Sequence, residues 1–131
     1  MQMLNAESSV RRLIAKFANS FDLKAWALFA RGGAFSERHV HPTGWATGVY
    51  YPADLSGEGT GGELVIGPPH EVEARGRDWP RATIRPEAGL LVLMPSYCMH
   101  WTLPLDGAGM RTSVAFDLLD KKRRPQDSEA G

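Results

Sequence analysis

The sequence has one cysteine, no excess of either charge and no long apolar run. Each of these features excludes a class of structure or function. Cys98 alone cannot form an internal disulfide, which is compatible with a reducing compartment. Fifteen Lys and Arg residues balance fifteen Asp and Glu residues, so the basic excess typical of nucleic-acid binding is missing. No stretch approaches the roughly 18 to 20 apolar residues of a membrane span, and basic residues interrupt the N-terminal apolar positions, unlike a signal peptide. We therefore expect a cytoplasmic protein with no nucleic-acid and no membrane partner.

The composition that remains is typical of one globular domain. Apolar residues make up 43% and charged residues 23% of 131 residues, which is ordinary for a protein that buries a single core. The one basic cluster, residues 121–124, precedes a proline and a polar stretch. We expect a single domain over residues 1–120 and a polar, mobile tail over residues 121–131.

Near the N-terminus, apolar residues recur at helical spacing, and basic residues occupy the other side. The apolar set is Val10, Leu13, Ile14, Phe17 and Phe21. Ser8 or Ser9 is suited to cap the start. The pattern predicts an amphipathic helix over about residues 7–20, which would cover one side of the sheet that follows.

After residue 20, short β-forming stretches alternate with turns. We expect strands at 25–31, 34–41, 45–51, 63–67, 82–85, 90–94, 100–103 and 111–119. Residues 68–80 read as a polar loop, and no second helix is expected. About eight short strands predict an all-β sandwich or barrel.

Three histidines stand in an order that suggests a metal site. Residues two apart on a strand point to the same face, so His39 and His41 can coordinate one metal ion together. His100 follows a later strand and could close the site. Neutral imidazole is the commonest protein ligand for iron, zinc, copper and nickel. A His-x-His pair is a weak signal by itself, and chance surface or core histidines are the alternative.

An arginine and a serine open the last predicted strand. Alternation puts Arg111, Ser113 and Asp117 on one face and a plainly apolar set on the other. An inward arginine is costly unless it meets an anion. A planar guanidinium binds a carboxylate bidentately, and Ser113 could donate a further hydrogen bond. The pattern indicates a carboxylate clamp beside the metal, with an exposed edge arginine as the alternative.

Several motifs follow one another at specific spacings. Histidine, arginine eleven residues later and serine two further on occur at His100, Arg111 and Ser113. Together with the motifs at residues 38–42, 47–51, 61–64 and 86–96, this order resembles that of 2-oxoglutarate/iron(II)-dependent dioxygenases. The resemblance covers about residues 25 to 119. Several of the motifs look like those of prolyl-hydroxylase-type enzymes, and they are especially similar to those of a bacterial 2OG-Fe(II) oxygenase subgroup.

The resemblance implies a double-stranded β-helix, a jelly-roll barrel whose mouth holds Fe(II), with 2-oxoglutarate as co-substrate. His39 and His100 would bind the metal. Arg111 would pair with the distal carboxylate of 2-oxoglutarate, with Ser113 assisting. A small-molecule or peptide substrate would be hydroxylated, with release of succinate and carbon dioxide.

Aromatic residues near these motifs are further candidates. Tyr51 would match the tyrosine that binds the same carboxylate in prolyl hydroxylases, but the sequence leaves open whether Tyr50 or Tyr51 faces the site. A core position for both tyrosines is the alternative. Trp45 and Trp79 lie near loops and could line a substrate cleft, with core packing as the alternative for both.

Position 41 departs from the pattern of the superfamily, most of whose members have Asp or Glu there. We interpret His41 as the third metal ligand, although an imidazole supplies no negative charge. Glu37 or a water is the alternative. The departure keeps open a catalytically inactive binding domain of the same fold.

A cupin-type metal-binding protein that does not use 2-oxoglutarate is a further alternative, because Gly33 and the His-x-His pair match the opening of a cupin motif. The glutamate expected shortly afterwards is absent, and a cupin has no need of Arg111. The chain is short for an oxygenase of this kind. A homodimer, in which a second copy covers the barrel in place of additional helices, is therefore a further alternative.

Overall fold

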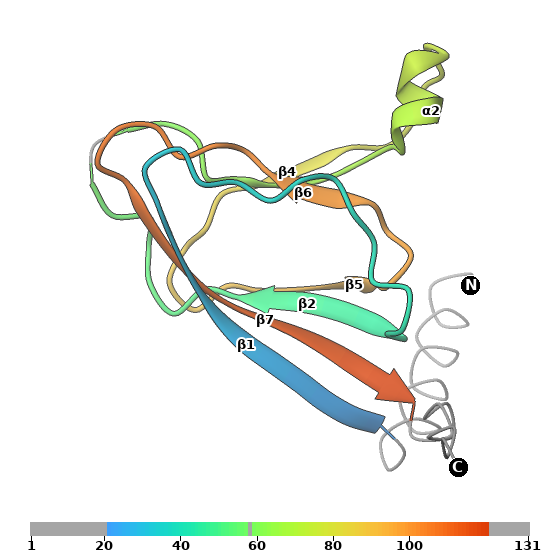
Figure 1. Cartoon of the computed structure of the whole chain (residues 1–131), viewed down its shortest axis with the longest axis horizontal. Coiled ribbons are helices and arrows are strands. Elements are labelled where there is room, and N and C mark those ends of the chain that lie inside the picture. The colour runs from blue at the N-terminus through green and yellow to red at the C-terminus, as the bar shows by residue number, and fades with distance from the viewer. Residues whose placement is uncertain (1–20, 58, 121–131) are drawn as a thin grey trace, which may run out of the picture.

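The computed structural model describes residues 21–57 and 59–120. Its strands form two antiparallel sheets that lie one above the other, as Figure 1 shows. The elements are β1 (Phe21–Arg31), β2 (Ala46–Tyr50), β3 (Leu64–Ile66), α2 (His70–Ala74), β4 (Ala82–Ile84), β5 (Leu91–Pro95), β6 (His100–Thr102) and β7 (Met110–Asp120). One sheet has the order β1-β7-β2-β5 and the other β4-β3-β6. The expected all-β architecture is confirmed, and the paired strands are antiparallel.

The four-stranded sheet is built around two long strands. β1 pairs with β7 along its whole length, from Phe21 opposite Asp120 to Arg31 opposite Met110. Because successive side chains alternate between faces, one face of this sheet looks toward the smaller sheet and the other looks away. We call these the inner face and the outer face. The inner face includes Trp26, Thr47, Val49, Met94, Arg111, Ser113 and Asp117.

Many of the buried side chains face the space between the two sheets. The buried apolar residues are Ala30, Ala46, Tyr51, Leu64, Val65, Met94 and Leu105. The polar ones are Thr47, Ser96, His100, Arg111, Ser113 and Asp117. Nearly half of the buried residues in the described part of the chain are therefore polar, which is unusual for a core that only stabilises the fold.

Residues 34–41 do not form the predicted strand. They run beside β6, but their pairing is irregular, because Ser36 N–H donates to Thr102 Oγ1 at 2.7 Å. A single isolated bridge remains, between His39 and His100. The segment is extended enough to pair locally but too interrupted to continue a ladder.

The expectation of no second helix was wrong, because α2 occupies part of the predicted polar loop. The carbonyl of Pro69 accepts hydrogen bonds from Val72 N and Glu73 N at 3.1 and 3.2 Å. Glu71 and Glu73 place negative charge in the first turn, where the helix dipole favours it. Within the part of the chain that the structure describes, no helix has the length and apolar character needed to cross a membrane.

The predicted helix over residues 7–20 and the tail over residues 121–131 lie outside the described residues. Both stay predictions, as does the division of the chain into one domain and a tail.

Candidate metal centre

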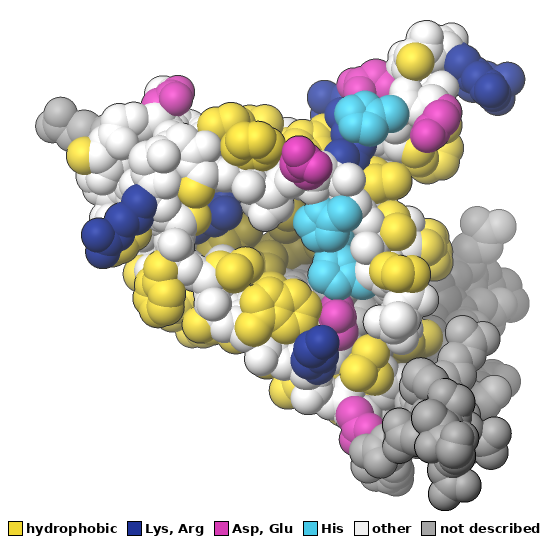
Figure 2. Space-filling view, in the orientation of Figure 1, with side chains coloured by type: hydrophobic (Ala, Val, Ile, Leu, Met, Phe, Trp, Pro, Cys, Tyr) yellow, Lys and Arg dark blue, Asp and Glu magenta, His cyan; other side chains and the backbone are white. Residues whose placement is uncertain are grey.

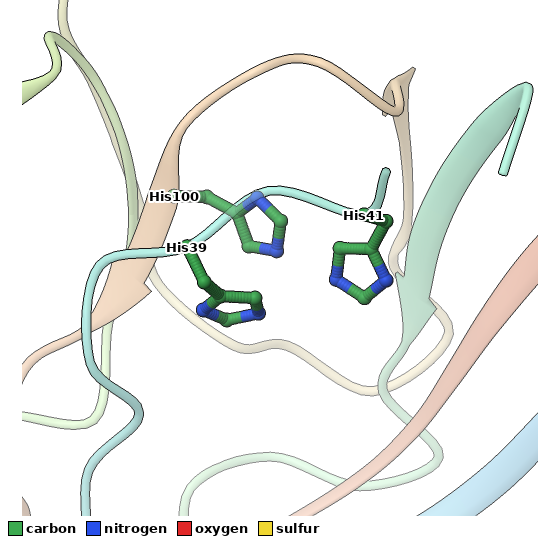
Figure 3. A group of neighbouring side chains, drawn as sticks. All are labelled: His39, His41 and His100. Atoms are coloured by element: carbon green, nitrogen blue, oxygen red, sulfur yellow. The ribbon is translucent and has the colours of Figure 1, made fainter. Parts of the chain in front are cut away.

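Three histidines converge at one end of the space between the sheets (Figure 3). Their potential ligand atoms all lie within 4.8 Å of one another. Ring centroids are 5.1 Å apart for His39 and His41, 4.4 Å for His39 and His100, and 5.1 Å for His41 and His100. The structure thus brings together all three histidines that the sequence singled out.

Backbone hydrogen bonds hold the two segments in place. His39 N–H donates to His100 O at 3.0 Å, and His100 N–H donates to His39 O at 3.0 Å. His41 N–H donates to Ser96 O at 3.0 Å. The His-x-His segment is therefore fixed at both histidines although it is not a regular strand.

Each imidazole has its Nδ1 next to an oxygen acceptor. His39 Nδ1 lies 2.6 Å from Glu37 O, and His100 Nδ1 lies 2.9 Å from Cys98 O. His41 Nδ1 lies 2.8 Å from Asp117 Oδ1. A proton on Nδ1 leaves the Nε2 lone pair free, and metal-binding histidines characteristically donate their other ring N–H in this way. The donor set fits a transition metal such as iron(II).

His100 is held in the uncharged form that a ligand requires. Its side chain is buried, and burial lowers its pKa to about 4. Proximity to His39 and His41 acts in the same direction, whereas the Cys98 carbonyl and Asp117 oppose it. At neutral pH this imidazole is therefore neutral and able to coordinate a metal.

The same cavity contains Arg111, Ser113 and Tyr51, which are 4%, 3% and 2% exposed. Its volume is about 190 Å³, and Figure 2 shows it as a hollow between the sheets with histidine side chains along its edge. Arg111 Nη1 donates to the carbonyl of Gly62 at 3.1 Å. Among the described residues, no carboxylate forms an ion pair with Arg111.

Burial affects the two ionisable groups of this cavity in opposite directions. It raises the pKa of Tyr51, against the effect of the neighbouring Arg111 guanidinium. It lowers the pKa of Arg111, against the effect of Tyr51. Tyr51 is thus a neutral hydroxyl donor beside a buried guanidinium, and together they form a pocket suited to an anion.

The structure separates the two tyrosines that the sequence left undecided. Tyr51 points into the cavity, and Tyr50 is 39% exposed on the outer face. Trp45 and Trp79 are not among the residues that line the cavity; Trp79 is 51% exposed. Their assignment to a substrate cleft stays a prediction.

Two residues near the histidines have no predicted role. Trp26 stacks on His41 with ring centroids 6.2 Å apart, and Asp117 contacts the same imidazole. Strand alternation already put Asp117 on one face with Arg111 and Ser113, which is a signal for its inward position. The position of Trp26 depends on the pairing of β1 with β7, which no local sequence pattern predicts.

Comparison with known protein families shows the family of this chain. The model of the family described as "Putative 2OG-Fe(II) oxygenase" matches residues 24–117. The chain belongs to this family. Oxygenases of the family use Fe(II) and 2-oxoglutarate, and the three-histidine site is placed to bind the metal. A search of curated proteins gave no match.

Solved structures show the same fold. A prolyl-4-hydroxylase from Pseudomonas putida is 23% identical with a TM-score of 0.65, and the match covers 91% of this chain and 65% of that one. A 2OG-Fe(II) oxygenase family oxidoreductase from Burkholderia pseudomallei is 18% identical with a TM-score of 0.59, covering 80% and 47%. A prolyl 4-hydroxylase from Phytophthora capsici is 20% identical with a TM-score of 0.56, covering 87% and 40%.

These matches confirm the predicted jelly-roll fold of the oxygenases. The chain spans between about two fifths and two thirds of the length of these three structures. At position 41 it carries an imidazole, and the carboxylate of Glu37 is not part of the histidine cluster.

Proposed function

We propose that the protein is an Fe(II)- and 2-oxoglutarate-dependent dioxygenase that hydroxylates a small-molecule or peptide substrate and releases succinate and carbon dioxide. The observation that carries this proposal is Arg111. A guanidinium that is 4% exposed lies in the same cavity as three convergent imidazoles. Burial of a cation is costly without an anion, so the cavity is suited to an anionic ligand beside the metal.

Three residues would hold the distal carboxylate of 2-oxoglutarate. Arg111 would supply charge and paired N–H donors, and Tyr51 and Ser113 would each supply a hydroxyl donor. All three are buried, so these bonds would form away from competing water. The hydrogen bond from Arg111 to Gly62 O orients the guanidinium in advance, which reduces the entropy lost on binding.

The three histidines would hold Fe(II), whose chemistry couples oxidative decarboxylation of 2-oxoglutarate to hydroxylation of the substrate. Leu64, Val49 and Met94 form an apolar part of the cavity wall, which limits the access of water. Trp26 and Leu28 line the cavity from β1. Leu28 is 41% exposed, so the substrate would approach along this side.

The test is succinate formation by purified protein supplied with Fe(II), 2-oxoglutarate and ascorbate. We expect Arg111→Ala to weaken 2-oxoglutarate binding by roughly 10- to 100-fold, because a charge-assisted pair contributes about 1.5 to 3 kcal/mol. Arg77→Ala, at an exposed position, is the matched control and should bind normally.

The two tyrosines give a second matched pair. Tyr51→Phe should weaken 2-oxoglutarate binding by roughly fivefold, the value of one neutral hydrogen bond, whereas Tyr50→Phe should not. Failure of the metal-loaded wild-type protein to bind 2-oxoglutarate would overturn the proposal. Metal binding without 2-oxoglutarate binding would point to a metal-binding protein of this fold that does not use 2-oxoglutarate, and binding of neither would point to an inactive domain of the fold.

A further inference from the structure

Asp117 is a buried carboxylate that touches one of the three histidines. Asp117 is 6% exposed and lies on the inner face near the end of β7. Oδ1 is 2.8 Å from His41 Nδ1, close enough for a hydrogen bond to form with a small rotation of either side chain. Among the described residues, this buried oxygen has no partner that meets the geometry of a hydrogen bond, so the short approach to His41 Nδ1 is its only polar contact. A carboxylate is costly to bury without a partner, so its position calls for an explanation.

The partner of His41 differs in kind from the partners of the other two histidines. His39 and His100 each face a neutral backbone carbonyl, whereas His41 faces a carboxylate. His41 belongs to a cluster made only of imidazoles, so the cluster itself contains no anionic ligand. The anionic group is therefore present, but one residue farther from the metal position.

The surroundings make this contact rigid. Asp117 lies opposite Thr47 on β2 and opposite Lys24 on β1, so strands flank it on both sides. Trp26 stacks against the His41 ring at an interplanar angle of 23°, and His100 stacks at 13°. Stacking restricts the tilt of the ring, and the contact with Asp117 restricts its rotation.

We propose that Asp117 is a positioning residue that fixes the orientation of His41 and supplies to the metal site the negative charge that His41 lacks. A carboxylate behind a coordinating histidine fixes its tautomer and strengthens it as a ligand. The inference rests on the proposed function for the presence of the metal. It concerns metal binding alone and does not depend on 2-oxoglutarate turnover.

Metal affinity without co-substrate tests the inference. Co²⁺ binding is measured by calorimetry and by the visible spectrum of the bound ion, which reports ligand geometry. We expect Asp117→Asn to weaken Co²⁺ binding by roughly 10- to 100-fold and to change the spectrum. Asp78→Asn removes a carboxylate from an exposed loop position and should leave both unchanged. Equal affinity and an equal spectrum for Asp117→Asn and wild type would overturn the inference.

A double-mutant cycle separates positioning from a general structural role. In the His41→Asp background there is no imidazole to orient, and two buried carboxylates would repel each other. Asp117→Asn should then leave Co²⁺ affinity unchanged or increase it. Similar losses in both backgrounds would show that Asp117 acts only on the fold and would overturn the inference.

A measurement on the unmodified chain covers the case in which Asp117→Asn does not fold. Nitrogen chemical shifts of the His41 ring in the Zn²⁺-loaded protein report which nitrogen carries the proton. A proton on Nδ1 supports the inference, and a metal on Nδ1 overturns it. If the wild-type protein binds no metal at all, the proposed function fails together with the inference. A normal wild-type affinity that Asp117→Asn does not alter would overturn the inference alone.

Discussion

His100 makes the stability of the metal-free protein depend on pH. Its pKa is about 4 in the folded protein, whereas an exposed histidine titrates near 6.5. As the pH falls between these values, the unfolded chain takes up the proton first. We therefore expect the contribution of His100 to lower the free energy of unfolding between about pH 6.5 and about pH 4, by at most about 3 kcal/mol. Urea unfolding in the presence of a chelator, at a series of pH values, measures this change.

A substitution at the same position isolates the contribution of His100. His100→Gln should flatten the pH dependence over this interval, whatever its effect on the absolute stability. His70→Gln, at an exposed position of α2, is the control and should keep the wild-type slope. A wild-type slope in His100→Gln would mean that other groups dominate the acid sensitivity.

At the scale of elements, the loop before β3 supports the carboxylate pocket. Gly62 has a φ of +85°, and its carbonyl oxygen accepts the hydrogen bond from Arg111. A Cβ at this position would lie 2.7 Å from Leu105 Cδ2. The loop therefore depends on a residue without a side chain.

Gly62→Ala should destabilise the protein by about 1 to 3 kcal/mol and weaken 2-oxoglutarate binding, because the acceptor of Arg111 moves. Gly76→Ala is the matched control, since Gly76 also has a positive φ of +61° but a Cβ there would meet no atom within 4 Å. Gly76→Ala should therefore be destabilised only by the positive φ of its backbone, and not by a clash of the added methyl group. Thermal unfolding and calorimetry measure the two effects, and equal behaviour of the two variants would contradict the role of the loop.

Regular strands could be predicted from the sequence, because alternation and turn residues are local signals. The predicted strands at 45–51 and 111–119 correspond to β2 and β7. The segment at 34–41 has similar residues, but its pairing depends on a side chain of β6, Thr102, which replaces a backbone partner. Such a contact between distant residues leaves no local pattern.

In the candidate site, too, some features could be predicted from the sequence and others could not. The histidines and Arg111 could be found from their order along the chain, since the structure places them in one cavity. The contact of Asp117 with His41 could not, because it joins residues 76 positions apart on neighbouring segments. Alternation gave the direction of the Asp117 side chain but not its partner.

At the scale of the whole molecule, the outer face of the four-stranded sheet is strongly apolar. Leu23 and Phe29 on β1 are 62% and 71% exposed, and Leu91 and Leu93 on β5 are both 59% exposed. Register places these side chains on the face opposite the cavity. Large exposed apolar side chains gathered on one face of a sheet often mark an interaction site. The sequence predicts an amphipathic helix over residues 7–20, whose apolar side is suited to cover it.

Deletion of residues 1–20 tests this prediction. If the segment covers the outer face, its loss should expose apolar surface and increase both self-association and the binding of an apolar dye. Sedimentation velocity and dye fluorescence measure these effects, and deletion of residues 121–131 is the control. Adding Leu91→Lys and Leu93→Lys to the shortened chain should restore the monomer, because charge on the same face opposes association. A shortened chain that stays monomeric and binds no more dye than the full chain would show that residues 1–20 do not cover this face.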